Sequence, residues 1–113
     1  MATEQNEHIE VIMGLIIYGG NAKSLSMEAI YAAKRGKFDL AAEKLNEANE
    51  SLVLAHHSQT SLLTKDASGD NIELTLLMVH GQDHLMNAIT FKDLATEVID
   101  VYRKIDGQDV SAI

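Results

Sequence analysis

Two short glycine-containing breaks constrain this chain more than any other feature, because they divide a sequence without proline into three long segments. The first break, residues 34–39, reads KRGKFD, and the second, residues 65–71, reads KDASGDN. Glycine after a basic turn is typical of a helix end, since it adopts the left-handed conformation at no steric cost. Ala, Leu, Glu, Met and Lys are abundant and lose little side-chain freedom in a helix. The sequence therefore predicts three helices.

The residues after each glycine predict where the next helix begins. Asp39 is a candidate N-cap of the second helix, and Asp70 with Glu73 three residues later forms a potential capping box for the third. Neither break is long enough for a domain linker, so residues 1–113 are expected to form a single domain. Short connections place neighbouring helices antiparallel, and the predicted fold is all-α, an antiparallel up-down-up three-helix bundle.

Apolar and small residues at helical spacing predict which faces of the first two helices pack. Small residues predominate in the first seam, which should let another backbone come close. This first seam comprises Ile12, Leu15, Gly19, Ala22, Ser26, Ala29 and Ala33. The second seam comprises Ala41, Leu45, Ala48, Leu52, Ala55, Gln59 and Leu62.

The third segment carries two stripes, one more than a single three-helix core requires. The first stripe comprises Leu77, His80, His84, Asn87, Phe91, Leu94, Val98, Val101 and Ile105. The second stripe comprises Ile72, Leu76, Val79, Asp83, Met86 and Thr90. The spare apolar stripe indicates self-association.

Charge and composition exclude several classes of function. The formal net charge of -8 has the wrong sign for a nucleic-acid backbone or an anionic membrane and favours a basic protein partner. No apolar run approaches the roughly 20 residues of a membrane-spanning helix. The chain has no cysteine and no basic region leading to a secretory cleavage site, so a cytoplasmic location is expected.

The stretch LLMVHGQDHLM, residues 76–86, places polar side chains inside an apolar segment. On a helix His80 lies beside both Asp83 and His84, while Gln82 points elsewhere. Reflecting the second and third helices about a turn near residue 68 sets His56 level with His80. A second reflection about residue 36 brings the first helix to the same level around Ile16 to Gly20. The predicted polar layer comprises His56, His57, Gln59, His80, Gln82, Asp83 and His84, with Gly19 and Gly20 beside it.

Several interpretations of this cluster remain open. His80 and His84 are satisfied core or interface residues in the simplest one, which fits a purely structural helical adaptor. Their His-x3-His spacing also suits a helical zinc-binding protein, although Gly81 stands where a zinc protease needs its Glu. A third interpretation makes one imidazole a nucleophile that accepts a phosphoryl group, because the phosphoramidate bond is labile enough to pass that group on.

Three stretches resemble the lactose/cellobiose-type IIA component of the bacterial phosphoenolpyruvate:sugar phosphotransferase system. They are VIMGLIIYGGNAKSLSMEAI near the start, AHHSQTSLL in the middle and VHGQDHLMNA in the third segment. The resemblance covers about residues 9–105 in the same order and spacing, and the His-x-Gln-Asp-His-Leu-Met motif is specific.

The resemblance implies a small cytoplasmic homotrimer that acts as a phosphotransferase component. His80 matches the residue that takes a phosphoryl group from phospho-HPr and hands it to a cysteine of the IIB component, which phosphorylates sugar as the membrane IIC component imports it. Gln82 and His84 match positions near that site. Asp83 matches an aspartate gathered at the threefold axis around a metal ion, usually assigned as Mg²⁺, one per trimer. Three carboxylates gathered there repel unless they are protonated or bridged by a cation.

Overall fold

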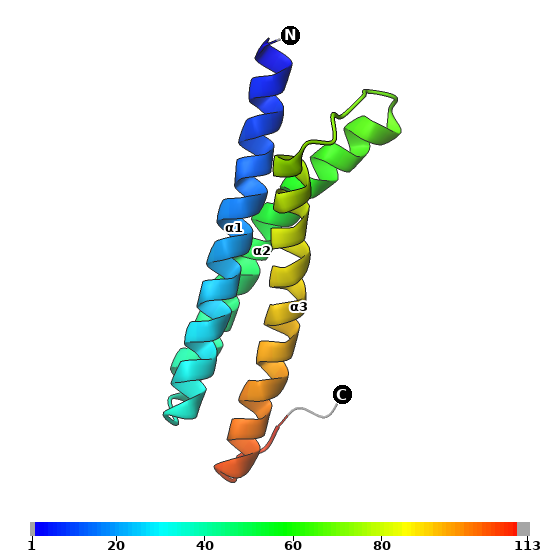
Figure 1. Ribbon diagram of the computed structural model, residues 1–113. Coiled ribbons are helices and arrows are strands. Elements are labelled where there is room, and N and C mark those ends of the chain that lie inside the picture. The colour runs from blue at the N-terminus through cyan, green and yellow to red at the C-terminus, as the bar shows by residue number, and fades with distance from the viewer. Residues whose placement is uncertain (1, 111–113) are drawn as a thin grey trace.

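The computed structural model describes residues 2–110, with side chains from residue 8 onward, and these residues form three helices. They are α1 (Ala2–Lys34), α2 (Phe38–Ala67) and α3 (Leu76–Ile105). Helices α1 and α3 run side by side in the same direction, and α2 returns in the opposite direction (Figure 1). The end of α2 leans away from α3, so that the segment after it crosses back to reach α3 (Figure 1). The predicted all-α, up-down-up arrangement is confirmed.

Both breaks contain a glycine in the conformation that the sequence predicts. Gly36 has φ 77° and Gly69 has φ 94°, in the left-handed region that side chains with a Cβ rarely adopt. The backbone N–H of Lys37 bonds to Ala32 O at 2.9 Å, and that of Asp70 bonds to Lys65 O at 3.1 Å. These bonds use carbonyls that the ends of α1 and α2 leave free.

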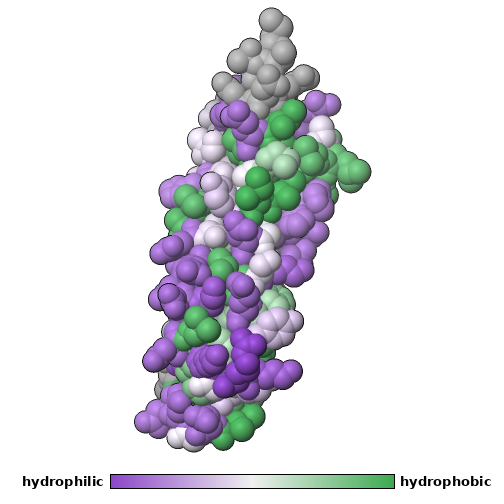
Figure 2. Space-filling view, turned by 90° about the vertical axis from the view of Figure 1, so that its left-hand side faces the viewer, coloured by the Kyte–Doolittle hydropathy of each residue, from purple (hydrophilic) through white to green (hydrophobic). Residues whose placement is uncertain are grey.

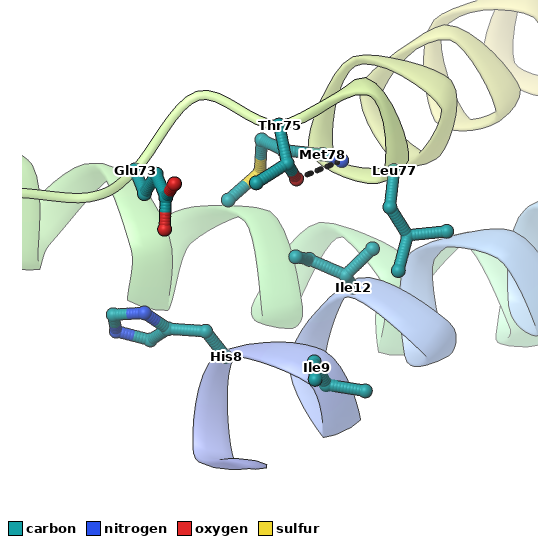
Figure 3. A pocket seen from close by; sticks show the side chains of 7 residues that line it. All are labelled: His8, Ile9, Ile12, Glu73, Thr75, Leu77 and Met78. Atoms are coloured by element: carbon teal, nitrogen blue, oxygen red, sulfur yellow. Dashed lines mark hydrogen bonds between the residues drawn. The ribbon is translucent and has the colours of Figure 1, made fainter. Parts of the chain in front are cut away.

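The predicted N-caps are wrong at both helices. Lys37, not Asp39, is the residue before α2, and its side chain makes no capping hydrogen bond. Asp39 lies in the first turn of α2, where its negative charge interacts favourably with the positive end of the helix dipole. Helix α3 begins six residues after Asp70, at Leu76, and Thr75 is its N-cap. The Thr75 side chain accepts a hydrogen bond from the backbone N–H of Met78 at 3.1 Å (Figure 3).

The seams predicted for α1 and α2 form the buried core. All seven residues of the first seam are buried, and among them Ser26 satisfies its hydroxyl by donating to Ala22 O at 2.8 Å. In the second seam Leu45 and Gln59 are half-buried and the other residues are buried. The core has two clusters, of which the larger lies toward the start of α3 and comprises Ile12, Leu15, Ala22, Ala48, Leu52, Ala55, Leu62, Met78, Leu85 and Ala88.

The face that α3 buries is neither of the two predicted stripes. Met78, Gly81, Leu85, Ala88, Ala95 and Ile99 are buried instead. Three of these residues are Gly or Ala because α1 comes close, so the true core face has less apolar character in the sequence than the faces beside it. Ile72 precedes the helix altogether.

Both predicted stripes therefore leave large apolar side chains on the surface of a single chain. In the stripe that contains Asp83, Leu76 is 86% exposed, Val79 56% and Met86 53%. We call Leu76, Val79, Asp83 and Met86 the exposed stripe. Apolar residues also gather near the end where α1 begins, whereas the rest of the face seen in Figure 2 is mainly hydrophilic. Large exposed apolar areas mark surfaces that associate with a partner.

Candidate functional site

The turn of α3 from His80 to His84 carries His80, the candidate phosphoryl acceptor. We call this turn the acceptor turn. His80 is exposed and His84 is half-buried. Their ring centroids lie 4.4 Å apart with an interplanar angle of 83°, an edge-to-face arrangement of the kind that aromatic rings prefer. An exposed ring that contacts a half-buried neighbour can be approached by another protein. These two residues are brought together as predicted.

Gln82 lies between these histidines in sequence but faces α2. Two positions along a helix are separated by about 200° around the axis, so the Gln82 side chain leaves the helix far from that of His80. Its Oε1 accepts a hydrogen bond from Gln59 Nε2 at 2.8 Å. In this conformation the Gln82 side chain therefore points away from the His80 ring of its own chain. The prediction that Gln82 lies near the phosphoryl acceptor rests on the family resemblance alone.

Asp83 is exposed and is held by a residue that the sequence analysis did not assign to the site. Asn87 Nδ2 donates to Asp83 Oδ1 at 2.9 Å and to the Asp83 backbone oxygen at 3.0 Å. The i, i+4 spacing of Asp and Asn is the signal that could have identified this contact. The bond fixes one carboxylate oxygen and leaves the other available in the middle of the exposed stripe.

Two glycines set the acceptor turn directly against α1. A Cβ added to Gly19 would lie 3.3 Å from both the backbone carbon and the backbone oxygen of His84. A Cβ added to Gly81 would lie 3.3 Å from Ile12 Cγ2 and 3.4 Å from Ile12 O. The predicted close approach is thus confirmed at Gly19. At Gly20, which was placed beside the same polar layer, an added Cβ would meet nothing within 4 Å.

The remaining histidines lie outside the acceptor turn. His56 and His57 are exposed and line a shallow groove with Ile89, which is more than one turn further along α3 than His84. The prediction that His56 is level with His80 is wrong because residues 68–75 form a longer connection than the turn expected near residue 68. His8 lies in a separate groove between the starts of α1 and α3, with Glu73 and apolar side chains (Figure 3).

A metal site within one chain finds no support in the structure. Among the described residues, no group of three or more His, Cys, Asp or Glu side chains could hold a metal ion. A structural zinc site takes four ligands, so His80 and His84 of one chain would need ligands from elsewhere.

None of the helices over residues 2–110 is long and apolar enough to cross a membrane.

Comparison with known proteins gives consistent results along nearly the whole chain. Residues 10–103 match the family described as "PTS system, Lactose/Cellobiose specific IIA subunit". The "Lichenan-specific phosphotransferase enzyme IIA component" of Bacillus subtilis is 51% identical over 96% of this chain and 99% of its own length.

Solved structures of related proteins resemble this chain in both fold and sequence. The cellobiose-specific enzyme IIA of Bacillus anthracis superposes with a TM-score of 0.87 at 44% identity, covering 90% of this chain and 94% of that one. The IIA(Chitobiose) of an Escherichia coli IIA–HPr complex superposes with a TM-score of 0.77 at 37% identity, covering 88% of this chain and 96% of that one.

Proposed function

The chain belongs to the lactose/cellobiose-specific IIA subunits of the sugar phosphotransferase system, and we propose that it carries a phosphoryl group on His80. It is thus a phosphotransferase component, which receives the group from phospho-HPr and gives it to a cysteine of the IIB component. The observation that carries the proposal is the exposed His80 ring held edge-to-face by His84 on a turn packed firmly against α1.

Two displacements at phosphorus account for the relay. An unprotonated His80 ring nitrogen attacks the phosphorus of phospho-HPr, and the N–P bond forms as the bond from phosphorus to HPr breaks. A IIB thiolate then attacks the same phosphorus; the S–P bond forms, the His80 N–P bond breaks and the electron pair returns to the ring. Both partners need direct access to His80, which an exposed ring on a helix surface provides. The IIC permease is reached only through IIB.

The solved IIA(Chitobiose)–HPr complex supports HPr as the donor. The net charge of -8 suits a basic docking surface on that partner and would speed encounter at low ionic strength.

Phosphoryl uptake by the wild-type chain tests the proposal. After incubation with phosphoenolpyruvate, enzyme I and HPr, intact mass should rise by one acid-labile phosphoryl group per chain. Addition of the IIB component should return the mass to its starting value. A wild-type chain that gains no mass while HPr is phosphorylated would overturn the proposal.

Self-association through the exposed stripe is part of the same proposal. Leu76, Val79 and Met86 surround Asp83 with apolar surface that water meets in a single chain. Three copies arranged around this stripe would bury it and bring three Asp83 carboxylates together. One oxygen of each is free of the Asn87 bond, and carboxylate oxygens are the ligands that Mg²⁺ takes. The three Asp83 carboxylates would thus together hold one Mg²⁺ per trimer, and its positive charge would offset their repulsion.

Replacement of Asp83 by Leu should keep the trimer and make it independent of the cation. The substitution removes three buried like charges and extends the apolar surface, which is expected to stabilise the assembly by about 1–4 kcal/mol. Sedimentation velocity with and without EDTA measures this directly. EDTA should weaken the trimer of the wild type and of Asp93→Leu, a variant of another exposed carboxylate on α3, but not that of Asp83→Leu. A monomeric Asp83→Leu chain would contradict the expectation.

A further inference from the structure

Gln59 makes a contact with α3 that has no role in the phosphoryl relay as described above. Within the part of the chain that the structure describes, both side-chain hydrogen bonds that join two helices come from this residue. Its Nε2 lies 2.8 Å from Gln82 Oε1 and 4.0 Å from Met86 Sδ. Gln59 and Gln82 are both half-buried, so water competes with their bond less than at an open surface.

The bond lies near the point where α2 leaves α3. Toward the α2 end the two helices diverge (Figure 1), and the surface between them opens into a groove lined by Leu62, Leu63, Asp66, Ile72, Leu74, Met78 and Gln82. Side-chain packing between α2 and α3 is therefore reduced on this side of the acceptor turn. A polar bond is left to fix the separation and the relative rotation of the helices there.

The acceptor turn is thus held on two sides. Gly19 fits against the backbone of His84 from α1, and Gln59 bonds to Gln82 from α2. Gln82 lies two residues from each histidine, so a rotation of this turn about the helix axis would redirect His80 and His84 together. The His80 ring itself has no hydrogen bond to a described residue, and its direction depends on the turn that carries it.

We propose that Gln59 is a positioning residue for phosphoryl transfer, acting through its hydrogen bond to Gln82. The inference rests on the proposed function, because it concerns the orientation of the His80 ring nitrogen toward the phosphorus atom. Near-attack geometry is sensitive to small displacements, since a shift of about 1 Å can slow a reaction by about 100-fold. In this role Gln59 acts only through Gln82, and its effect should lie on the rate of transfer rather than on docking.

Gln59→Met tests the proposal, because methionine keeps the length and apolar contact of the side chain but cannot donate to Gln82. In rapid-quench single turnovers with phospho-HPr, the maximal rate of transfer should fall about 10-fold, while the HPr concentration at half-saturation stays within about 2-fold. Gln82→Met should show the same loss. The double variant should be no slower than either single variant, because each substitution alone already removes the same Gln59–Gln82 hydrogen bond.

Gln59→Glu and Thr60→Ala supply the rescue and the control. A carboxylate at position 59 accepts from the Gln82 amide nitrogen after that amide turns over, so Gln59→Glu should transfer within about 3-fold of wild type. Thr60 is exposed on the next position of α2, and Thr60→Ala should transfer like wild type. Circular dichroism at the assay temperature should show equal helix content in every variant.

Three outcomes would overturn the inference: wild-type transfer by Gln59→Met, no recovery in Gln59→Glu, or additive losses in the double variant. If the wild-type chain itself takes no phosphoryl group, the proposed function fails first. If wild type is phosphorylated normally and one of these outcomes occurs, only the role of Gln59 fails.

Discussion

His80→Ala is expected to abolish phosphoryl acceptance while the protein remains a folded helical assembly. The substitution removes the only ring nitrogen that the proposed relay uses, so no N–P bond can form. Alanine has the highest helix propensity, and the His80 side chain is exposed, so the loss should leave the helix intact. Intact mass after incubation with phosphoenolpyruvate, enzyme I and HPr should show no phosphoryl group on the variant.

His57→Ala is the matched control for this experiment. His57 is also an exposed imidazole, but it lies on α2 and lines the groove with His56 and Ile89. The variant should gain one phosphoryl group per chain at the wild-type rate. A His80→Ala chain that still gains the group would refute His80 as the acceptor, and peptide mapping under alkaline conditions would then identify the residue that carries it.

The sequence predicted the fold well where one periodicity governed each helix. In α1, every residue of the predicted seam is buried, because its small residues at steps of three and four face both other helices. Gly36 and Gly69 mark the two helix ends, since each needs a positive φ that few other residues tolerate. These features are local, and local chemistry was sufficient to predict them.

The packing face of α3 could not be predicted from hydrophobicity because its contacts with α1 are made by small residues. Gly81 and Ala88 face the core, whereas Leu76 and Val79 face water in a single chain. The most apolar stripe of α3 therefore lies on the surface of a single chain rather than in its core. Large apolar residues left outside the core of one chain mark a surface that associates with a partner.

The candidate site was predicted only in part, for reasons of geometry. The contact of His80 with His84 follows from helical spacing, and the close approach at Gly19 follows from the small residues of the first seam. The position of His56 depended on the length of the connection between α2 and α3. Because Thr75 rather than Asp70 caps α3, that connection is longer than expected and shifts the register of the two helices.

Gly19→Leu is expected to lower the free energy of unfolding by about 3 kcal/mol, the upper end of the cost of overpacking a core. An added Cβ already lies 3.3 Å from the backbone of His84, and a backbone cannot rotate away as a side chain can. Leucine would therefore force α1 and α3 apart at the acceptor turn. Urea denaturation followed by circular dichroism, at one fixed protein concentration because oligomers gain stability by mass action, measures the change.

Gly20→Leu makes this test specific, because it places the same side chain one residue further along the same helix. An added Cβ at Gly20 meets nothing within 4 Å, so the variant should gain the helix propensity of leucine over glycine, about 0.7 kcal/mol. The two adjacent substitutions should thus change stability in opposite directions. Equal effects would mean that α1 and α3 do not approach closely at Gly19. Slower phosphoryl transfer in Gly19→Leu alone, measured below its unfolding midpoint, would show that the close contact of α1 with α3 also sets the aim of His80.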